Sequence, residues 1–479
     1  MGNVTVDFSV TQGAIKPMNA VNNGPVSPNV RKPKMSNFEL YKAANFPYAR
    51  NHDASFCMFY GGEHVVDVHR IFKNFDADEN DPENYFFEPT DKYLLNTIEA
   101  GTKIFYRLGS SIEHGYKYGT RVPKDFHKWA RICEHIILHY NCGWANGYEL
   151  GIEYWEIWNE PDCFNGHSNP CWQGTEEEFI ELYCVSTKYL KEKFPNLKIG
   201  GPAFCTGPMY DSKKRFFEGV KKNNAVMDFY SYHCYARDPA EIGDVARQAR
   251  SYLDEYGFEG VETSLNEWNY IKGWVDDDWD YSMAVEQGLK GASFIAGTMA
   301  QGQSAPVDML MYYDARPCIM NGLFGDNFKT RKGYYSFIAF DRLKKLGTYV
   351  PCETDDKTLH SCAATDGKSS AIMLTYYDDS ARGSVDIAFD MWKANEDEKS
   401  YYDCYKEVTA GGVDGIEGLP RKEVRIDVKN VNGPFKVSLY CTDEDKNLEL
   451  VRVEEYPAGT TELYVEMTLF STWLVEIDG

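Results

Sequence analysis

The sequence lacks any continuous run of about 18 apolar residues, and its basic side chains are outnumbered by acidic ones. Without such a run, the chain is not expected to span a membrane. The 50 Lys and Arg residues against 73 Asp and Glu residues give a net charge of −23. A field of that sign disfavours binding to nucleic acid and to anionic membrane surfaces. We therefore expect no nucleic acid and no membrane among the partners of this protein.

An apolar stretch of signal-peptide length is also missing from the first 30 residues, so the sequence does not predict export. The 13 cysteines are odd in number and scattered along the chain. Reduced thiols in the cytoplasm are the simplest interpretation of that pattern. We therefore expect a cytoplasmic protein.

Aromatic residues, at 15% of the chain, are more frequent than usual. Their faces can serve as platforms for sugar rings, but they also fill hydrophobic cores, and composition leaves both interpretations open. With 479 residues, the chain is too long for one ordinary core. We expect two domains, one of them large.

Short apolar runs alternate with helical patterns across residues 46–346. Several of these runs are continuously apolar or β-branched, as in parallel strands that are buried on both faces. The predicted strands are 46–52, 64–69, 103–109, 152–159, 197–203, 227–233, 262–267 and 308–314. The clearest helical patterns follow residue 123 and run through about 239–256, 280–300 and 331–346. Alternating strands and helices predict an α/β fold, a (β/α)8 TIM barrel.

The pattern changes in residues 347–479, where strand-like runs are separated by Gly, Asp, Asn and Pro. The predicted strands are 370–377, 385–389, 424–428, 435–440 and 461–467, and they predict an accessory all-β sandwich. Residues 1–45 precede the barrel and contain a strand-like run at 4–10. We expect this N-terminal segment to add strands to the sandwich.

Two motifs place a carboxylate beside an asparagine and aromatic rings at the end of a predicted strand. They are Trp158-Asn159-Glu160-Pro161 and Asn266-Glu267-Trp268-Asn269. Hydrolysis of a glycosidic bond needs two facing carboxyl groups, one to protonate the leaving oxygen and one to attack the anomeric carbon or activate water. Glu160 is the candidate acid/base and Glu267 the candidate nucleophile. The alternatives are a surface-loop glutamate and a strand-terminal ion pair, respectively.

Polar and aromatic residues also gather at the ends of other predicted strands, which in a barrel meet at one face. The segments are Arg50-Asn51-His52-Asp53, Tyr232-His233-Cys234-Tyr235 and Tyr312-Tyr313-Asp314-Ala315-Arg316. We expect a single active site there. Glu156 shares a strand face with Glu160 but lies deeper, so we expect it to pair with Arg50 or Arg107 inside the barrel.

Two other chemistries are alternatives to this interpretation. Cys163, His167 and Cys171 have spacings that zinc could use, but an obvious fourth ligand is missing. Cys57, Cys234 or Cys318 could act as a nucleophile with a histidine as base, but no local signature supports that. We expect neither a metal nor a cofactor.

At these residues the chain resembles glycoside hydrolase family 39, which contains β-xylosidases and α-L-iduronidases. The Glu160 and Glu267 motifs carry the resemblance, together with Ser231-Tyr232-His233-Cys234-Tyr235 and the Arg50-Asn51-His52 strand ending. The resemblance implies a retaining mechanism with carboxyl groups about 5 Å apart.

By the same resemblance, individual substrate-binding roles are expected for the residues around the two glutamates. Asn159 is expected to bond the sugar 2-hydroxyl, Tyr235 or His233 to hold Glu267, and His52 to border the −1 subsite. Trp268, Tyr313 and Arg316 complete the expected substrate-binding set.

Departures from the family pattern leave the sugar open. Tyr106-Arg107-Leu108-Gly109 stands where relatives carry a glutamate, and Asp53-Ala54-Ser55 replaces a Gly-Leu-Leu segment. We expect an exo-acting hydrolase of short oligosaccharides or small glycosides, with a β-xyloside as the first expectation. Alternatives are an α-L-arabinoside, a galactoside or a uronic acid such as iduronide, which would need a cation such as Arg316, Lys272 or Arg50.

A second alternative is a non-catalytic carbohydrate-binding barrel, against which the presence of both Glu160 and Glu267 speaks. The sandwich is expected to pack on the barrel and help to form a homo-oligomer. The other interpretation is that it serves as a carbohydrate-binding module.

Overall fold

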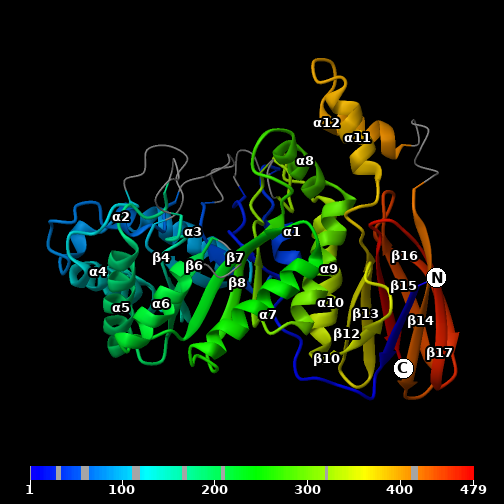
Figure 1. Ribbon diagram of the computed structural model, residues 1–479, viewed down its shortest axis with the longest axis horizontal. Coiled ribbons are helices and arrows are strands. Elements are labelled where there is room, and N and C mark those ends of the chain that lie inside the picture. Colours follow the sequence, from blue (N-terminus) through cyan, green and yellow to red (C-terminus); the bar gives the residue numbers. More distant parts are fainter. Residues whose placement is uncertain are drawn as a thin grey trace.

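Eight parallel strands close into a barrel in the computed structural model, which describes residues 2–28, 34–54, 64–110, 119–163, 170–205, 211–318, 322–410 and 419–479 (Figure 1). The barrel strands follow one another in chain order around the closed sheet. They are β2 (Ala20–Asn22), β3 (Tyr48–Asn51), β4 (Lys103–Leu108), β5 (Tyr154–Ile157), β6 (Lys198–Phe204), β7 (Phe229–Ala236), β8 (Glu262–Tyr270) and β9 (Met309–Tyr312). Parallel pairing of β2 with β9 closes the ring.

Helices connect successive strands and cover the outside of the barrel. They are α1 (Phe38–Ala43), α2 (Val68–Ile71), α3 (Glu88–Glu99), α4 (Phe126–Cys142), α5 (Glu176–Lys193), α6 (Asp211–Lys222), α7 (Pro239–Glu255), α8 (Asp276–Gln287), α9 (Leu289–Ser304) and α10 (Lys332–Leu346), with short 3-10 turns at Pro82–Asn84 and Trp144–Asn146. Thr175 and Glu178 form a capping box, which satisfies backbone donors at the start of α5. The (β/α)8 barrel is confirmed.

One predicted strand of the barrel is wrong. Residues 64–69 form no strand; they lead into the short helix α2, and Val66 is buried without belonging to the sheet. The missing strand is β2, which lies in the segment assigned to the sandwich. Because β2 has three residues, it is too short to show a period-two pattern in the sequence. The barrel therefore begins well before residue 46.

Two sheets form the accessory sandwich. The four-stranded sheet has the order β11 (Cys352–Thr354), β1 (Gly2–Asp7), β14 (Arg421–Val431) and β17 (Gly459–Thr468). The six-stranded sheet has the order β10 (Thr348–Val350), β12 (Leu359–Thr365), β13 (Ser369–Tyr376), β18 (Thr472–Asp478), β15 (Phe435–Thr442) and β16 (Asn447–Tyr456). As expected, the N-terminal β1 joins this domain, where it pairs in parallel with β14.

The predicted strand at 385–389 is a helix instead. It lies within α11 (Ser384–Lys393), which is followed by α12 (Tyr401–Thr409), and the two extend beyond the sandwich near α8 (Figure 1). Val385 and Phe389 are four residues apart and so lie on one helix face, while the Asp386 side chain accepts a hydrogen bond from the Gly383 amide at the helix start. A five-residue apolar run cannot distinguish this arrangement from a strand.

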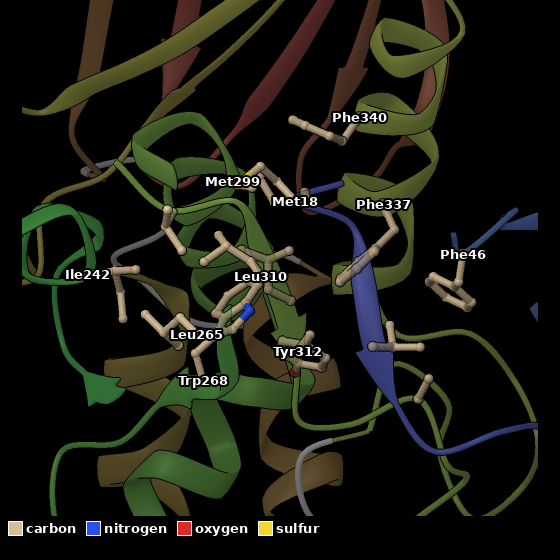
Figure 2. Close-up of a cluster of buried hydrophobic side chains, with 14 of the residues drawn as sticks. Met18, Phe46, Ile242, Leu265, Trp268, Met299, Leu310, Tyr312, Phe337 and Phe340 are labelled. Atoms are coloured by element: carbon tan, nitrogen blue, oxygen red, sulfur yellow. The ribbon is translucent and has the colours of Figure 1, made fainter. Parts of the chain in front are cut away.

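Barrel and sandwich share a packed boundary. Helices α9 and α10 pack on β12 and β13 of the six-stranded sheet. Figure 2 shows the apolar core on the other side of these helices, where Met299 of α9 and Phe337 of α10 face Leu310 and Tyr312 of β9. Within the described ranges, none of the helices has the length and apolar character needed to cross a membrane.

Candidate active site

Glu160 and Glu267 come together at the carboxyl end of the barrel. Glu160 follows β5, and Glu267 lies in β8. One oxygen of each carboxyl group and one ring nitrogen of His233, in β7, all lie within 4.8 Å of one another. Residues that the sequence places far apart thus meet where the ends of three strands converge.

Two hydrogen bonds hold the Glu267 carboxyl group. An Arg50 Nη donates to Oε1 over 2.8 Å, and the Tyr235 hydroxyl donates to Oε2 over 3.0 Å. Burial raises the pKa of Glu267, and the nearby Glu160 adds to the rise, whereas His233, Arg50 and Tyr235 oppose it. The guanidinium and the phenol therefore stabilise the ionised form that a nucleophile needs.

Arg50 connects the site to the interior of the barrel. Besides Glu267, its guanidinium donates to Glu156 over 2.6 Å and to the Asn159 Oδ1 over 2.6 Å. Ser231 and Asn266 also donate to Glu156. Glu156 is thus a buried, fully coordinated carboxylate, and of its two expected partners Arg50 is the one observed.

Arg107 does not pair with Glu156, so that alternative is wrong. Its guanidinium forms an ion pair with Asp67, the residue before α2. Arg50, Ser231 and Asn266 already donate hydrogen bonds to the Glu156 carboxylate. Glu156 therefore does not need a second positively charged partner. Asp67 is also buried, so its carboxylate needs a positively charged partner, which Arg107 provides.

His233 anchors the other carboxyl group. Its Nδ1 lies 2.8 Å from the Glu160 Oε1, and burial lowers the pKa of His233 to about 4. The ring is therefore neutral near pH 7. Its Nε2 is buried and makes no hydrogen bond among the described residues. We assign the proton to Nδ1, because an unpaired acceptor costs less than an unpaired donor, so that His233 donates to Oε1.

Unusual backbone geometry turns Glu160 into the site. Trp158 and Glu160 have φ values of 76° and 49°, a region that non-glycine residues rarely occupy. The Glu160 amide donates to the Ala203 carbonyl of β6 over 2.8 Å, which holds this turn. A Cβ on Gly109 would lie 2.9 Å from the Trp158 Cα, so only glycine allows the close approach of the neighbouring strand end. Strain of this kind concentrates at functional sites.

The remaining predicted pocket residues lie in a buried polar network. The Tyr313 hydroxyl donates to the Asp53 Oδ2 over 2.5 Å, and the His52 ring lies edge-on to Tyr313 at 6.0 Å. Arg316 is buried between Asp53, at 3.6 Å, and Asp314, at 3.2 Å. Arg316, one of the three cations expected to serve a uronate, is therefore neutralised by carboxylates of the protein itself. Direct sugar contacts of Asn159, His52, Tyr313 and Arg316 remain predictions.

Trp268 does not line the site, and its predicted contact with the substrate is wrong. Its side chain is buried on the outer face of the barrel, where its ring lies 5.1 Å from that of Tyr312 and 6.2 Å from that of Phe294. Figure 2 shows it in the core with Leu265 and Leu310. Successive strand residues point to opposite faces, so the residue after Glu267 points away from the pocket.

A different tryptophan borders the site. Trp274, in the loop after β8, is 55% exposed, and its ring lies 5.0 Å from that of Tyr235, the residue that donates to Glu267. Trp279 stacks on Trp274 at 5.7 Å. Sequence reasoning missed this pair because loop geometry decides its position. It also missed Asn22 of the unrecognised β2, which accepts a hydrogen bond from Arg50.

The two alternative chemistries rested partly on residues outside the described ranges. Cys57 and His167 fall there. Cys234 and Cys318 are buried, and burial raises the pKa of both thiols, which makes them poor nucleophiles.

Comparison with known proteins identifies one set of proteins that is similar in sequence and another that is similar in fold. A β-xylosidase from Caldicellulosiruptor saccharolyticus is 27% identical over 195 residues, which cover 36% of this chain and 38% of that protein's length. Among solved structures, a glucosidase from Croceicoccus marinus has a TM-score of 0.75 at 19% identity, covering 100% of this chain and 99% of its own. A monomeric β-xylosidase from Caulobacter crescentus has a TM-score of 0.68 at 15% identity, covering 100% and 99%.

The structural likenesses establish the fold alone, because their sequence identities are low. The family model of glycosyl hydrolases family 39 matches residues 60–318, more than half of the chain. That segment includes both Glu160 and Glu267. The protein belongs to glycosyl hydrolases family 39.

Proposed function

We propose that this protein is a retaining glycosidase that removes single sugars from short oligosaccharides through a covalent glycosyl-enzyme. The observation that carries the proposal is the separation of oxygens of Glu160 and Glu267, which lie within 4.8 Å of each other. Retaining enzymes hold their carboxyl groups about 5–5.5 Å apart, whereas inverting enzymes leave about 6.5–9.5 Å for a water molecule.

The two carboxyl groups divide the reaction between them. In the first step, a Glu267 oxygen bonds to the anomeric carbon while Glu160 transfers its proton to the leaving oxygen, and the glycosidic bond breaks. In the second, the Glu160 carboxylate takes a proton from water, which attacks the anomeric carbon and releases Glu267 as a carboxylate. Arg50 and Tyr235 stabilise that charge before and after the ester exists.

A β-xyloside is the first candidate substrate, supported by the family and by the β-xylosidase relative. We include a cytoplasmic location in the proposal, because its reducing conditions would preserve the 12 unbridged cysteines of the described residues. Small imported glycosides would suit that compartment better than polymers.

Aryl-glycoside hydrolysis tests the proposal directly. The purified chain is assayed on β-xyloside, α-L-arabinoside, β- and α-galactoside, β-glucoside and α-iduronide. We expect one dominant activity, on the β-xyloside, with the β-anomer of the sugar as first product by NMR. An inverted first product would contradict the retaining mechanism. If the folded protein hydrolysed none of these glycosides, the result would favour the non-catalytic carbohydrate-binding barrel.

Trp274 is proposed to stack on the sugar that leaves. If cleavage removes one terminal sugar, any further sugar ring belongs to the aglycone. Trp274 offers an exposed aromatic face there, and only the ring of Tyr235 lies between it and Glu267. We expect Trp274→Ala to raise KM for a disaccharide about fivefold, which corresponds to about 1 kcal/mol of aromatic contact. With a glycosyl fluoride, which has no aglycone ring, KM should change far less.

The matched control for this change is Tyr464→Ala. Tyr464 is a similarly exposed aromatic residue on β17, in the sandwich sheet. We expect wild-type KM values for both substrates in that variant. An equal rise for disaccharide and fluoride in Trp274→Ala would place the tryptophan at the glycone instead.

A further inference from the structure

The side chains of two cysteines meet beside Glu160. Cys163 lies shortly after β5 and Glu160, and Cys205 directly follows β6. The two Sγ atoms are 3.0 Å apart, although 42 positions separate the residues in the chain. Both side chains are partly exposed, so a small dissolved molecule can reach them. The reaction of Glu160 and Glu267 makes no use of this thiol pair.

Hydrogen bonds hold the two segments that carry these thiols. The Glu160 amide donates to the Ala203 carbonyl over 2.8 Å, and the Cys205 amide donates to the Asp162 Oδ1 over 2.8 Å. Within the first segment, the Cys163 amide donates to the Glu160 carbonyl over 3.0 Å. Because the main chain is held on both sides of the pair, each sulfur stays within reach of the other at a high effective concentration.

The distance between the two sulfurs suits a covalent bond. A disulfide holds its sulfurs about 2.05 Å apart, so this pair has to approach by about 1 Å, a change that rotation of the two side chains can supply. We propose that Cys163 and Cys205 form a disulfide bond under mild oxidation, and that this bridge stabilises the turn that carries Glu160. Disulfides in the cytoplasm are usually transient, so in a reducing compartment the pair of thiols is the resting form.

A small dissolved disulfide such as oxidised glutathione serves as the oxidant. One cysteine thiolate attacks it, which forms a mixed disulfide and releases one glutathione thiolate. The second cysteine thiolate then attacks the protein sulfur of that mixed disulfide and releases the other. The protein is thereby oxidised by two electrons, the glutathione disulfide is reduced to two thiols, and the two cysteine protons pass through water to the released thiolates.

The chemistry of the thiols sets the conditions for this reaction. Although the hydrogen bond with Cys163 lowers it, burial raises the pKa of the Cys205 thiol to about 11. Thiolate, the reactive form, is therefore scarce at neutral pH, and the bridge should form slowly there. A mildly alkaline buffer is the appropriate medium for testing it.

Cys171 is the competing partner for Cys163. Its Sγ lies within 4.8 Å of the Cys163 Sγ and 3.8 Å from the Glu160 Oε2. The Cys171 side chain is buried, however, and the 3.0 Å contact of Cys163 is with Cys205. We therefore expect the bridge to join Cys163 to Cys205 and to leave Cys171 as a thiol.

Peptide mapping of the full chain tests the bridge. The protein is incubated with excess oxidised glutathione at mildly alkaline pH, its remaining thiols are alkylated, and the digest is analysed by mass spectrometry. We expect Cys163 and Cys205 in one cross-linked pair of peptides that separates on reduction. Cys142→Ser, which removes an exposed thiol at the end of α4, should form the same bridge. A bridge from Cys163 to Cys171, or no bridge at all, would overturn the proposal.

Thermal melting tests the stabilising effect. The bridge joins residues 42 positions apart, and closing such a loop restricts the unfolded chain. We expect the oxidised wild type to unfold about 5 °C above its reduced form. Cys163→Ser and Cys205→Ser should each lose this shift, while their reduced forms melt near the reduced wild type.

Two melting results would contradict the stabilising role. One is a wild type whose melting temperature does not change when the bridge forms, and the other is a shift that survives either cysteine change, which would assign it to other thiols. Neither measurement requires hydrolysis of a glycoside. The fate of this inference is therefore independent of the proposed function.

Discussion

Glu267→Ala is expected to lower kcat on the best aryl glycoside by at least about 10⁴-fold, because the variant cannot form the covalent intermediate. Rates are followed by release of the aryl group. Arg50 keeps its bonds to Glu156 and Asn159 in the variant, so the pocket should retain its shape and the loss should be chemical. A melting curve close to that of the wild type checks this.

Azide is expected to restore part of the activity of the same variant. With the carboxylate gone, the small anion can enter its place and attack the anomeric carbon directly, which yields a glycosyl azide of inverted configuration. Glu262→Ala, at the opposite end of the same strand, should behave as the wild type does with or without azide. Undiminished hydrolysis by Glu267→Ala would exclude this residue as the nucleophile.

Glu160→Ala should separate substrates by the quality of their leaving group. A sugar leaving group needs its oxygen protonated, and general acid catalysis contributes about 10²–10⁴-fold. A dinitrophenolate leaves without a proton. We therefore expect kcat/KM for a disaccharide to fall by about that factor more than kcat/KM for the dinitrophenyl glycoside, measured on the same preparation.

Glu153→Ala is the matched control, since Glu153 lies just before β5 and pairs with Lys198 at the far end of the barrel. It should leave the ratio of the two activities unchanged. Equal losses on both substrates in Glu160→Ala would mean that the residue shapes the pocket without transferring a proton.

Much of this site was accessible from sequence because its chemistry sits at strand ends. A strand that stops at a carboxylate beside asparagine can be recognised without knowing its neighbours, and a barrel brings such ends together. That reasoning found Glu160 and Glu267. It also identified Glu156 as a buried carboxylate, since its spacing from Glu160 gives the same face but a deeper layer.

What the sequence could not supply is register and loop geometry. Both Arg50 and Arg107 could have neutralised Glu156, and only the position of Asp67 decides between them. Trp268 sits beside Glu267 in the chain but on the other face of the strand, whereas Trp274 reaches the site from a loop. The three residues of β2 carry too little pattern to be recognised.

The parallel pairing of β1 with β14 also affects how the chain is made. Val4 lies opposite Val424 in that sheet, so during synthesis β1 has to wait for a partner that is made 420 residues later (424 − 4 = 420). At about 5–20 residues per second, this delay is roughly 20–80 s. Throughout it, an unpaired edge is available to neighbouring nascent chains. The sandwich is therefore the part of the molecule whose assembly in the cell depends most on protection by chaperones.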